Sequence, residues 1–220
     1  MSAITLNAYP PNTKEYFDIL IKCGATHFAL FGGAVRDADY SAYHNKQIHI
    51  NDHDIRVVGP FVFNSADPDS SDPKTTESFD DFLKSLEKEL DCKYTLEPSP
   101  GTDRVRYVFR TKIFSSSSSS SYERPEDTLD ISFRHVSQKV LSTMPVENVA
   151  LDRITKCDIG LSAVAIDPKM QAWALDQYIM DRNDKTLTIF MINDRERRLT
   201  YAERLKKKFP DHTILEYYFR

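Results

Sequence analysis

The sequence predicts an α/β or α+β protein with a mixed β-sheet flanked by helices. Segments with helical spacing of apolar residues alternate with short apolar runs typical of strands. Glycine-containing or polar turns separate these segments. The 220 residues are 40% hydrophobic and 28% charged, which is ordinary for a globular protein with its own core. We therefore expect a single domain over residues 1–220, with its core at about 25–190.

The first part of the chain predicts a helix, a strand, a tight turn and a second helix. Residues 12–25 have a helical apolar face, and "HFALF" at 27–31 indicates a short strand. Gly32 and Gly33 follow at once, and a helix is expected directly after them. Glycine allows close approach to backbone N–H groups, and a helix start offers the positive end of its dipole. This turn is typical of an anion-binding site.

The remaining segments continue the mixed pattern. A helix is expected at 76–90, and the stretch "LTIFMI" at 187–192 fits either a helix or a strand. The C-terminal part, 191–220, is expected to contain a basic helix at about 195–208. Polar residues at about 60–76 and the serine run with its flanks at about 115–126 predict flexible loops. Further strands are expected at 104–114, 158–166 and 171–175.

Charge and cysteine content exclude several classes of protein. The net charge of −4 gives no overall attraction to polyanions, so any nucleic-acid contact must be local. The three cysteines are scattered, which argues against a disulfide framework or a zinc site. The glycine turn lacks the Lys-Ser/Thr ending of a P-loop. No apolar run is long enough for a membrane span, and we expect an intracellular, cytoplasmic protein without membrane contact.

Paired carboxylates are the main candidate for chemistry. In "NDHDIRVVG", strand alternation places Asp52 and Asp54 on one face and sends His53 into the core. "TLDISFRH" repeats this arrangement with Asp130. If the two strands are neighbours, three aspartates come together, and a divalent cation or an arginine compensates their repulsion. Mg²⁺, or Mn²⁺, bound to carboxylates and substrate phosphates supports phosphoryl or nucleotidyl transfer. An isolated Asp-x-Asp is more often a solvated strand face.

Two motifs resemble a known family. "FGGAVRD" at 31–37 resembles the Gly-Gly-x-Val-Arg-Asp signature of polymerase-β-like nucleotidyltransferases, in the branch of bacterial-type poly(A) polymerases and CCA-adding tRNA nucleotidyltransferases. "NDHDIRV" resembles the Asp-x-Asp strand that follows it in that branch. "KCDIGLSAVAIDP" at 156–168 is similar to the branch's Arg-Arg-Asp-Phe-Thr-Ile-Asn-Ala segment. The resemblance implies the nucleotidyltransferase fold and covers about residues 25–190.

The resemblance also implies roles for individual residues. Metal binding and catalysis would fall to the carboxylates, and nucleotide binding to the glycine turn and to the 156–168 segment. One departure is Cys157, which stands where the branch has a second arginine. The basic helix at 195–208 resembles a remnant of the branch's neck helix. The implied catalytic and metal-binding residues are Asp52, Asp54 and Asp130, and the implied nucleotide-binding residues are Gly32, Gly33, Arg36, Asp37, Lys156 and Asp158.

The implied function is a magnesium-dependent nucleotidyltransferase. It would transfer a nucleoside monophosphate from an NTP to an acceptor hydroxyl and release pyrophosphate. The acceptor is left open between an RNA 3′ end, a protein side chain and a small molecule, as are the preferred base and the oligomeric state. The alternative is a degenerate nucleotidyltransferase fold that serves as a nucleotide-binding or protein-interaction module.

Overall fold

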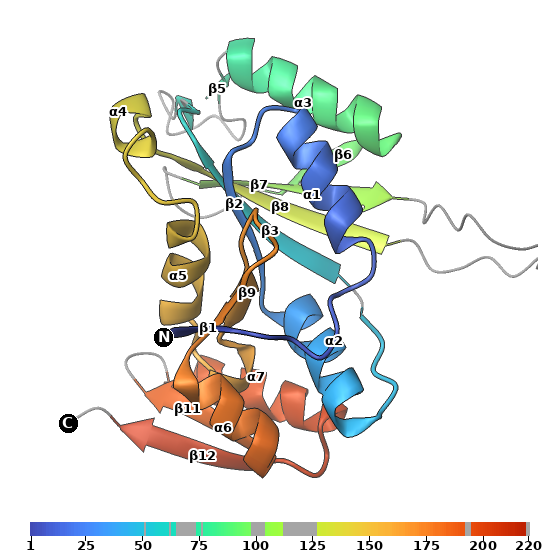
Figure 1. Cartoon of the computed structure of the whole chain (residues 1–220), viewed down its shortest axis with the longest axis vertical. Coiled ribbons are helices and arrows are strands. Elements are labelled where there is room, and N and C mark those ends of the chain that lie inside the picture. The colour runs from blue at the N-terminus through green and yellow to red at the C-terminus, as the bar shows by residue number, and fades with distance from the viewer. Residues whose placement is uncertain are drawn as a thin grey trace, which may run out of the picture. The chain divides into compact units, whose positions relative to one another are not determined.

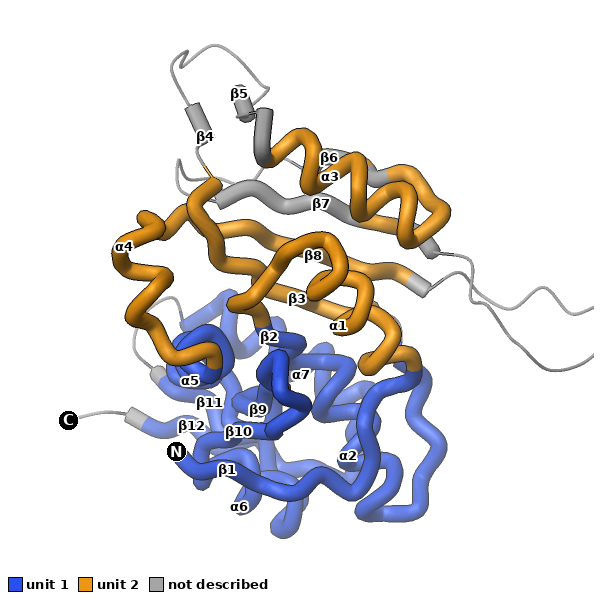
Figure 2. Tube along the Cα trace, turned by 45° about the horizontal axis from the view of Figure 1, so that its top comes forward, with its two compact units in different colours: residues 1–11, 29–50, 147–220 blue, residues 12–28, 51–146 orange. Residues whose placement is uncertain are grey.

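The structure is a computed structural model of the whole chain (Figure 1). Two compact units make up the chain, and Figure 2 colours them separately. Unit 1 comprises residues 1–11, 29–50 and 147–220, and unit 2 comprises residues 12–28 and 51–146. The residues that the structure describes are 1–50, 52–61, 63–64, 74–75, 77–97, 104–111, 127–191 and 195–218.

Unit 1 contains short antiparallel strands and a separate parallel pair. The antiparallel strands follow the order β1 (Ser2–Ile4), β10 (Ala172–Ala174), β9 (Val164–Ile166) and β2 (His27–Phe31), whose first two residues belong to unit 2. Every residue of β9 is buried, and strands pair with it on both edges. The parallel pair consists of β11 (Thr186–Met191) and β12 (Thr213–Tyr218).

The helices of unit 1 include the two that the sequence predicted there, one directly after Gly33 and one at about 195–208. They are α2 (Gly33–His44), α5 (Asn148–Thr155), the 3₁₀ turn η1 (Gly160–Ser162), α6 (Asp176–Asp184) and α7 (Arg195–Lys208). The strand expected over 158–166 is wrong for its first part, because only Val164–Ile166 is strand. The chain turns at Gly160, where a Cβ would lie 2.5 Å from side-chain atoms of Asp181 and Gln177. Glycine therefore lets η1 pack closely against α6.

Unit 2 has a mixed sheet. Its strand order is β3 (Asp52–Gly59), β8 (Asp127–His135), β7 (Arg104–Thr111) and β6 (Tyr94–Glu97). The β3–β8 pair is parallel, and the β8–β7 and β7–β6 pairs are antiparallel. A small antiparallel pair joins β4 (Phe63–Asn64) to β5 (Lys74–Thr75). The helices are α1 (Thr13–Lys22), α3 (Glu77–Leu90) and α4 (Gln138–Leu141).

The core of unit 2 lies between this sheet and its long helices. Figure 1 shows α1 and α3 side by side over one face of the sheet. The apolar stripe of α3 supplies Phe79 and Leu86, and alternate residues of β8 supply Ile131 and Phe133. All four side chains are fully buried. The rings of Phe79 and Phe133 meet edge to face with centroids 5.1 Å apart, a preferred aromatic geometry.

Most predicted elements are confirmed, and the ambiguous stretch at 187–192 forms strand β11. The short elements β1, β4, β5, β6, α4, α5 and η1 were not predicted, and β4 and β5 lie within the loop expected at about 60–76. The C-terminal strand β12 was not predicted either. Of the loops expected at about 60–76 and 115–126, residues 62, 65–73 and 76 and the whole second loop lie outside the described residues. None of the helices within the described ranges is long and apolar enough to cross a membrane.

Candidate nucleotide and metal site

The glycine turn of unit 1 joins β2 to α2. Gly32 has φ 72° and ψ −125°, a conformation that side-chain-bearing residues rarely adopt. Its N–H donates to the carbonyl of Val164 (3.1 Å), and its carbonyl accepts from the N–H of Arg36 (3.0 Å). The first N–H groups of a helix have no partner within it, and the N-cap Gly32 has no side chain to cap them. Gly32 and Gly33 are half-exposed, so a ligand can approach this helix start.

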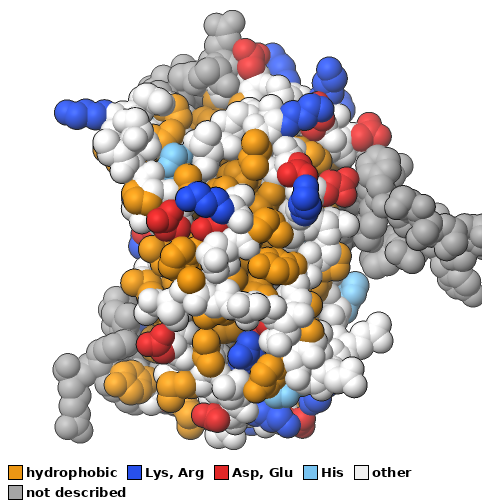
Figure 3. All heavy atoms as spheres, in the orientation of Figure 1, with side chains coloured by type: hydrophobic (Ala, Val, Ile, Leu, Met, Phe, Trp, Pro, Cys, Tyr) orange, Lys and Arg blue, Asp and Glu red, His pale blue; other side chains and the backbone are white. Residues whose placement is uncertain are grey.

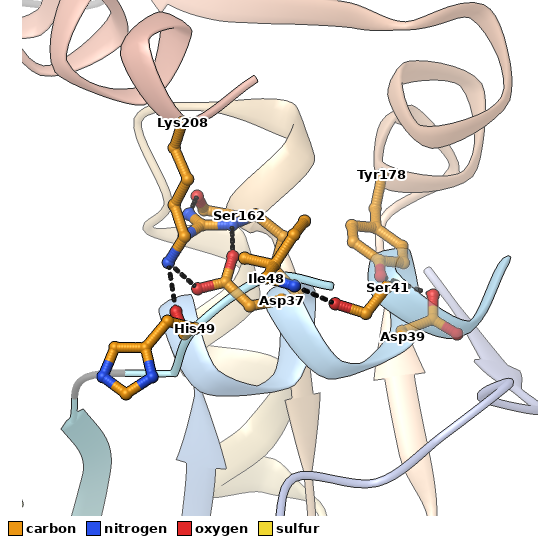
Figure 4. A network of polar contacts seen from close by, with 9 residues as sticks. Asp37, Asp39, Ser41, Ile48, His49, Ser162, Tyr178 and Lys208 are labelled. Carbon is orange, nitrogen blue, oxygen red and sulfur yellow. Dashed lines mark hydrogen bonds and ion pairs between the residues drawn. The ribbon is translucent and has the colours of Figure 1, made fainter. Parts of the chain in front are cut away.

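Arg36 and Asp37 lie beneath the turn in a buried polar network. Arg36 Nε donates to Asp37 Oδ1 (2.7 Å), and Arg36 Nη1 donates to Ser162 Oγ (3.0 Å). Lys208 Nζ, at the end of α7, donates to Asp37 Oδ2 (2.5 Å) and to the carbonyl of His49 (2.9 Å), as Figure 4 shows. Arg36 and Asp37 are only 3% and 2% exposed. Their observed contacts join α2 to η1 and α7.

Electrostatics keep the Arg36 guanidinium charged. Burial alone would lower the pKa of Arg36, but the Asp37 carboxylate and Tyr201 outweigh that effect and raise the pKa. The guanidinium also lies over the ring of Phe209, 5.3 Å from its centroid. The predicted contact of Arg36 and Asp37 with a nucleotide stays a prediction, and the geometry gives both residues a role in holding α2.

The aspartates of unit 2 lie on neighbouring parallel strands. Asp54 on β3 is directly opposite Asp130 on β8, and Asp52 is opposite Thr128. Partners in register point to the same face, so the expected face with Asp52, Asp54 and Asp130 forms. Asp130 is 5% exposed, Asp54 is half-exposed and Asp52 is exposed.

His53 occupies the opposite face, as predicted. Its side chain is 1% exposed, and its ring meets the ring of Tyr16 edge to face with centroids 5.2 Å apart. This packing separates the imidazole from the carboxylate face. We therefore assign His53 to the core of unit 2.

The chemistry of this face fits a hard divalent cation. Carboxylate oxygens are the ligands that Mg²⁺ and Mn²⁺ prefer, and Mg²⁺ commonly uses one or two carboxylates together with substrate oxygens. Asp54 and Asp130 supply such a pair on strands about 4.8 Å apart. Within the described part of the chain, no group of three acidic, histidine or cysteine side chains gathers closely enough to hold a metal ion alone. The fit is therefore to a cation that shares its ligands with a substrate.

Residues 156–158, for which nucleotide binding is predicted, contact other parts of the protein in the structure. Lys156 Nζ lies 2.5 Å from Asp152 Oδ1, one helical turn earlier and at the surface. Asp158 Oδ1 lies 2.8 Å from Arg198 Nη2 on α7. The thiol of Cys157 donates to the carbonyls of Arg153 and Ser162, and burial raises its pKa to about 11. Cys157 therefore stays a neutral thiol and does not replace an arginine electrostatically.

A known fold matches these elements. A solved CCA-adding enzyme in complex with CTP superimposes with a TM-score of 0.56 and 14% sequence identity, over 93% of this chain and 40% of that chain. The chain shares the nucleotidyltransferase fold of this CCA-adding enzyme. A CCA-adding enzyme from Bacillus stearothermophilus in complex with CTP also matches, with a TM-score of 0.42 and 14% identity, over 90% of this chain and 38% of that one.

The likeness is one of structure. No protein-family model matches the sequence, and no curated protein matches it. The chain spans 40% and 38% of the lengths of the two CCA-adding enzymes. At 14% identity the nucleotidyltransferase fold is shared, and activity has to be argued from this chain's own residues.

Sequence reasoning missed three residues that support this nucleotidyltransferase fold. Ser162 and Lys208 hold Arg36 and Asp37, and Arg198 holds Asp158. Arg198 and Lys208 belong to the basic helix that the sequence predicted at about 195–208. They differ from their neighbours on α7 only in the direction of their side chains, which point toward carboxylates of other elements. Lys207, for example, is exposed.

Proposed function

We propose that this chain is a metal-dependent nucleotidyltransferase, which uses Mg²⁺ or Mn²⁺ to transfer a nucleoside monophosphate from an NTP to an acceptor hydroxyl. The register of Asp54 against Asp130 carries the proposal, because it places two carboxylates on one face of adjacent parallel strands. The fold match supports the same function, since the CCA-adding enzyme that superimposes with a TM-score of 0.56 was solved with CTP.

In this proposal each residue has a defined task. Asp54 and Asp130, with Asp52 on the same face, share the cation with phosphate oxygens of the substrate, and the cation when bound would offset phosphate charge. The acceptor oxygen forms a bond to the α-phosphorus, and the bond from that phosphorus to the bridging oxygen of the β-phosphate breaks. Asp130 accepts the proton of the acceptor hydroxyl, and pyrophosphate leaves.

The glycine turn of unit 1 is the proposed phosphate-binding element. The N–H groups at the start of α2, next to Gly32 and Gly33, donate to the β- and γ-phosphates. Lys156 and Asp158 remain proposed nucleotide contacts, and either would exchange its present partner for the ligand. Arg36 and Asp37 act mainly by holding α2 in the orientation that this cradle needs.

The acceptor is the open part of the proposal, with an RNA 3′ end, a protein side chain and a small molecule as candidates. On the face in Figure 3, Lys and Arg side chains are interspersed with Asp and Glu. On α7, Arg195 pairs with Glu216 (3.0 Å), in addition to the Arg198 and Lys208 pairs described above. These pairs partner three of the seven basic side chains of α7 with carboxylates.

The test is incorporation of label from each of the four α-labelled NTPs with Mg²⁺. Total RNA and a protein extract are offered in separate reactions, and the Asp52→Ala variant is the matched control. Label in RNA identifies a terminal transferase and its base, and label in protein identifies a nucleotidylating enzyme. Equal label from Asp52→Ala would contradict the metal assignment.

The second candidate is a degenerate fold that binds nucleotide or protein without catalysis. The observation in its favour is that no group of three metal-binding side chains forms among the described residues. Equilibrium dialysis with labelled NTP, with and without Mg²⁺, separates the candidates. Mg²⁺-dependent NTP binding without transfer to RNA, protein or small hydroxyl compounds would favour the binding module.

A further inference from the structure

A cavity lies in unit 2, at the end of β3 that is remote from Asp52 and Asp54. Its volume is about 370 Å³, within the range of about 300–1,000 Å³ that is usual for small-molecule sites. The carboxyl-terminal residues of β3, Val58 and Gly59, form part of its wall. Gly59 follows Asp54 by five residues, which corresponds to about 17 Å along a strand. The cavity is therefore distinct from the carboxylate face.

Aromatic and aliphatic side chains make the wall of this cavity. Phe61 and Phe82 both line it, and their ring centroids are 5.6 Å apart. Leu141 of α4 adds an aliphatic surface. Phe61 can fold back here because residue 59 is glycine: a Cβ at that position would lie 2.5 Å from the Phe61 ring. The ring is also packed against Phe79 and Phe133, so this wall is fixed in place.

The polar groups around the cavity give it a negative electrostatic potential. Asp81 of α3 lines it, and so do Cys23 and Gly24, where α1 ends and the negative end of its dipole lies. Helix α3 carries five acidic residues against two lysines. Lys84 lies 3.8 Å from Asp81, but both side chains are largely exposed, so this pair is weak and leaves the carboxylate available to a ligand.

We propose that this cavity binds a small organic cation, with an apolar body between Phe61 and Phe82 and an ammonium or guanidinium group at Asp81. The body removes aromatic surface from water. The cation gains from the Asp81 carboxylate, from the helix end and from the aromatic faces. A neutral molecule of the same shape gains only the burial of its apolar body against the aromatic rings. The proposal is independent of nucleotidyl transfer.

The test compares 1-naphthylmethylammonium with its neutral counterpart, 1-naphthylmethanol, by titration calorimetry or NMR with the full chain. We expect the cation to bind with a Kd on the order of 0.1–1 mM, as ligands of this size do. It should bind about three- to tenfold more tightly than the alcohol, as one partly exposed ion pair with a helix end allows. Equal affinities in the wild-type protein would overturn the proposal, and so would no binding of either compound.

Three variants locate the site. Asp81→Asn should reduce the preference for the cation to about twofold or less. Asp80→Asn, a neighbouring carboxylate of α3 outside the cavity wall, should preserve it. Ser85→Leu, on an exposed position that lines the cavity, should weaken both compounds by filling the space. Unchanged binding to a folded Ser85→Leu variant, or equal effects of the two aspartate changes, would overturn the assignment.

The cysteines provide an independent readout of the same binding. Cys23 lines the cavity, whereas Cys92 follows α3 and does not line it. Both thiols are half-buried. We expect the bound cation to slow alkylation of Cys23 by iodoacetamide and to leave the rate at Cys92 unchanged, as measured by mass spectrometry. Equal protection of both thiols would overturn binding at this cavity.

Discussion

Lys208, the last residue of α7, lies 2.5 Å from the buried carboxylate of Asp37 on α2, and the two residues are 171 positions apart in the chain. Lys208 also donates to the carbonyl of His49, in the segment between α2 and β3. One ammonium group therefore holds the helix that follows the glycine turn and the segment that leads toward the Asp-x-Asp strand. Figure 4 shows this arrangement.

Replacing Lys208 by methionine should destabilise the protein by about 1–3 kcal/mol, because Asp37 loses one of two charged donors while it stays buried. Lys207→Met changes an exposed neighbour and should cost no more than about 0.5 kcal/mol. Urea unfolding measures both. Similar free energies of unfolding for the two variants would show that the Lys208 contact contributes little.

These contacts explain which parts of the site were predictable. The Gly-Gly turn and the face of Asp52, Asp54 and Asp130 follow from local sequence, because glycine content and alternation along a strand are visible in a few residues. The Ser162 contact with Arg36 joins positions 126 apart, and no local pattern contains it.

The same distinction holds for the fold. Helix α3 was predicted because its apolar stripe is long and regular. Strand β12 was missed because its pairing partner, β11, fits either a helix or a strand when its sequence is considered alone. The parallel pairing of Thr213–Tyr218 with Thr186–Met191 is visible only in three dimensions. The strand expected at 158–166 is confirmed only for Val164–Ile166, because Gly160 permits a close turn against α6 before it.

A pair of glycine variants tests the conformation of the turn. Gly32 has φ 72°, so Gly32→Ala should cost about 1–3 kcal/mol in the free energy of unfolding. At Gly33 a Cβ would meet only Arg36 Nη2 at 3.7 Å, an ordinary contact, and the position is helical. Gly33→Ala should therefore be neutral or slightly stabilising. Thermal and urea unfolding compare them, and equal losses would contradict the assigned backbone conformation.

The carboxylate pair predicts a response to metal. Mg²⁺ should raise the melting temperature of the wild-type protein, and EDTA should reverse the rise, because a cation relieves repulsion between Asp54 and Asp130. Asp130→Asn should remove most of this response and lower nucleotidyl transfer by at least about 100-fold. Differential scanning calorimetry and the labelled-NTP assay measure the two effects.

The control for this prediction is Asp91→Asn, at a turn where φ is 47° and asparagine is well accommodated. Its response to Mg²⁺ should match that of the wild-type protein. A full Mg²⁺ response in Asp130→Asn would place the bound metal elsewhere.

The buried ring of His212 is expected to make the free energy of unfolding depend on pH below neutrality. Its ring is 2% exposed, packs 5.2 Å from the rings of Tyr40 and Phe209, and has no hydrogen-bond partner at either nitrogen among the described residues. Burial, followed by the charges of His44 and Lys46, lowers its pKa from 6.5 to about 4, against an opposing effect of Asp211.

The unfolded chain therefore binds a proton at His212 below pH 6.5, whereas the folded protein binds it only below about pH 4. Stability should fall as the pH drops through this window, by about 2–3 kcal/mol from this residue. His212→Phe keeps an aromatic ring and should remove that part of the loss. His49→Gln, at an exposed position, should retain it. Urea unfolding at pH 7, 5.5 and 4.5 tests this, and an unchanged pH dependence in His212→Phe would show that the ring is protonated without cost in the folded protein.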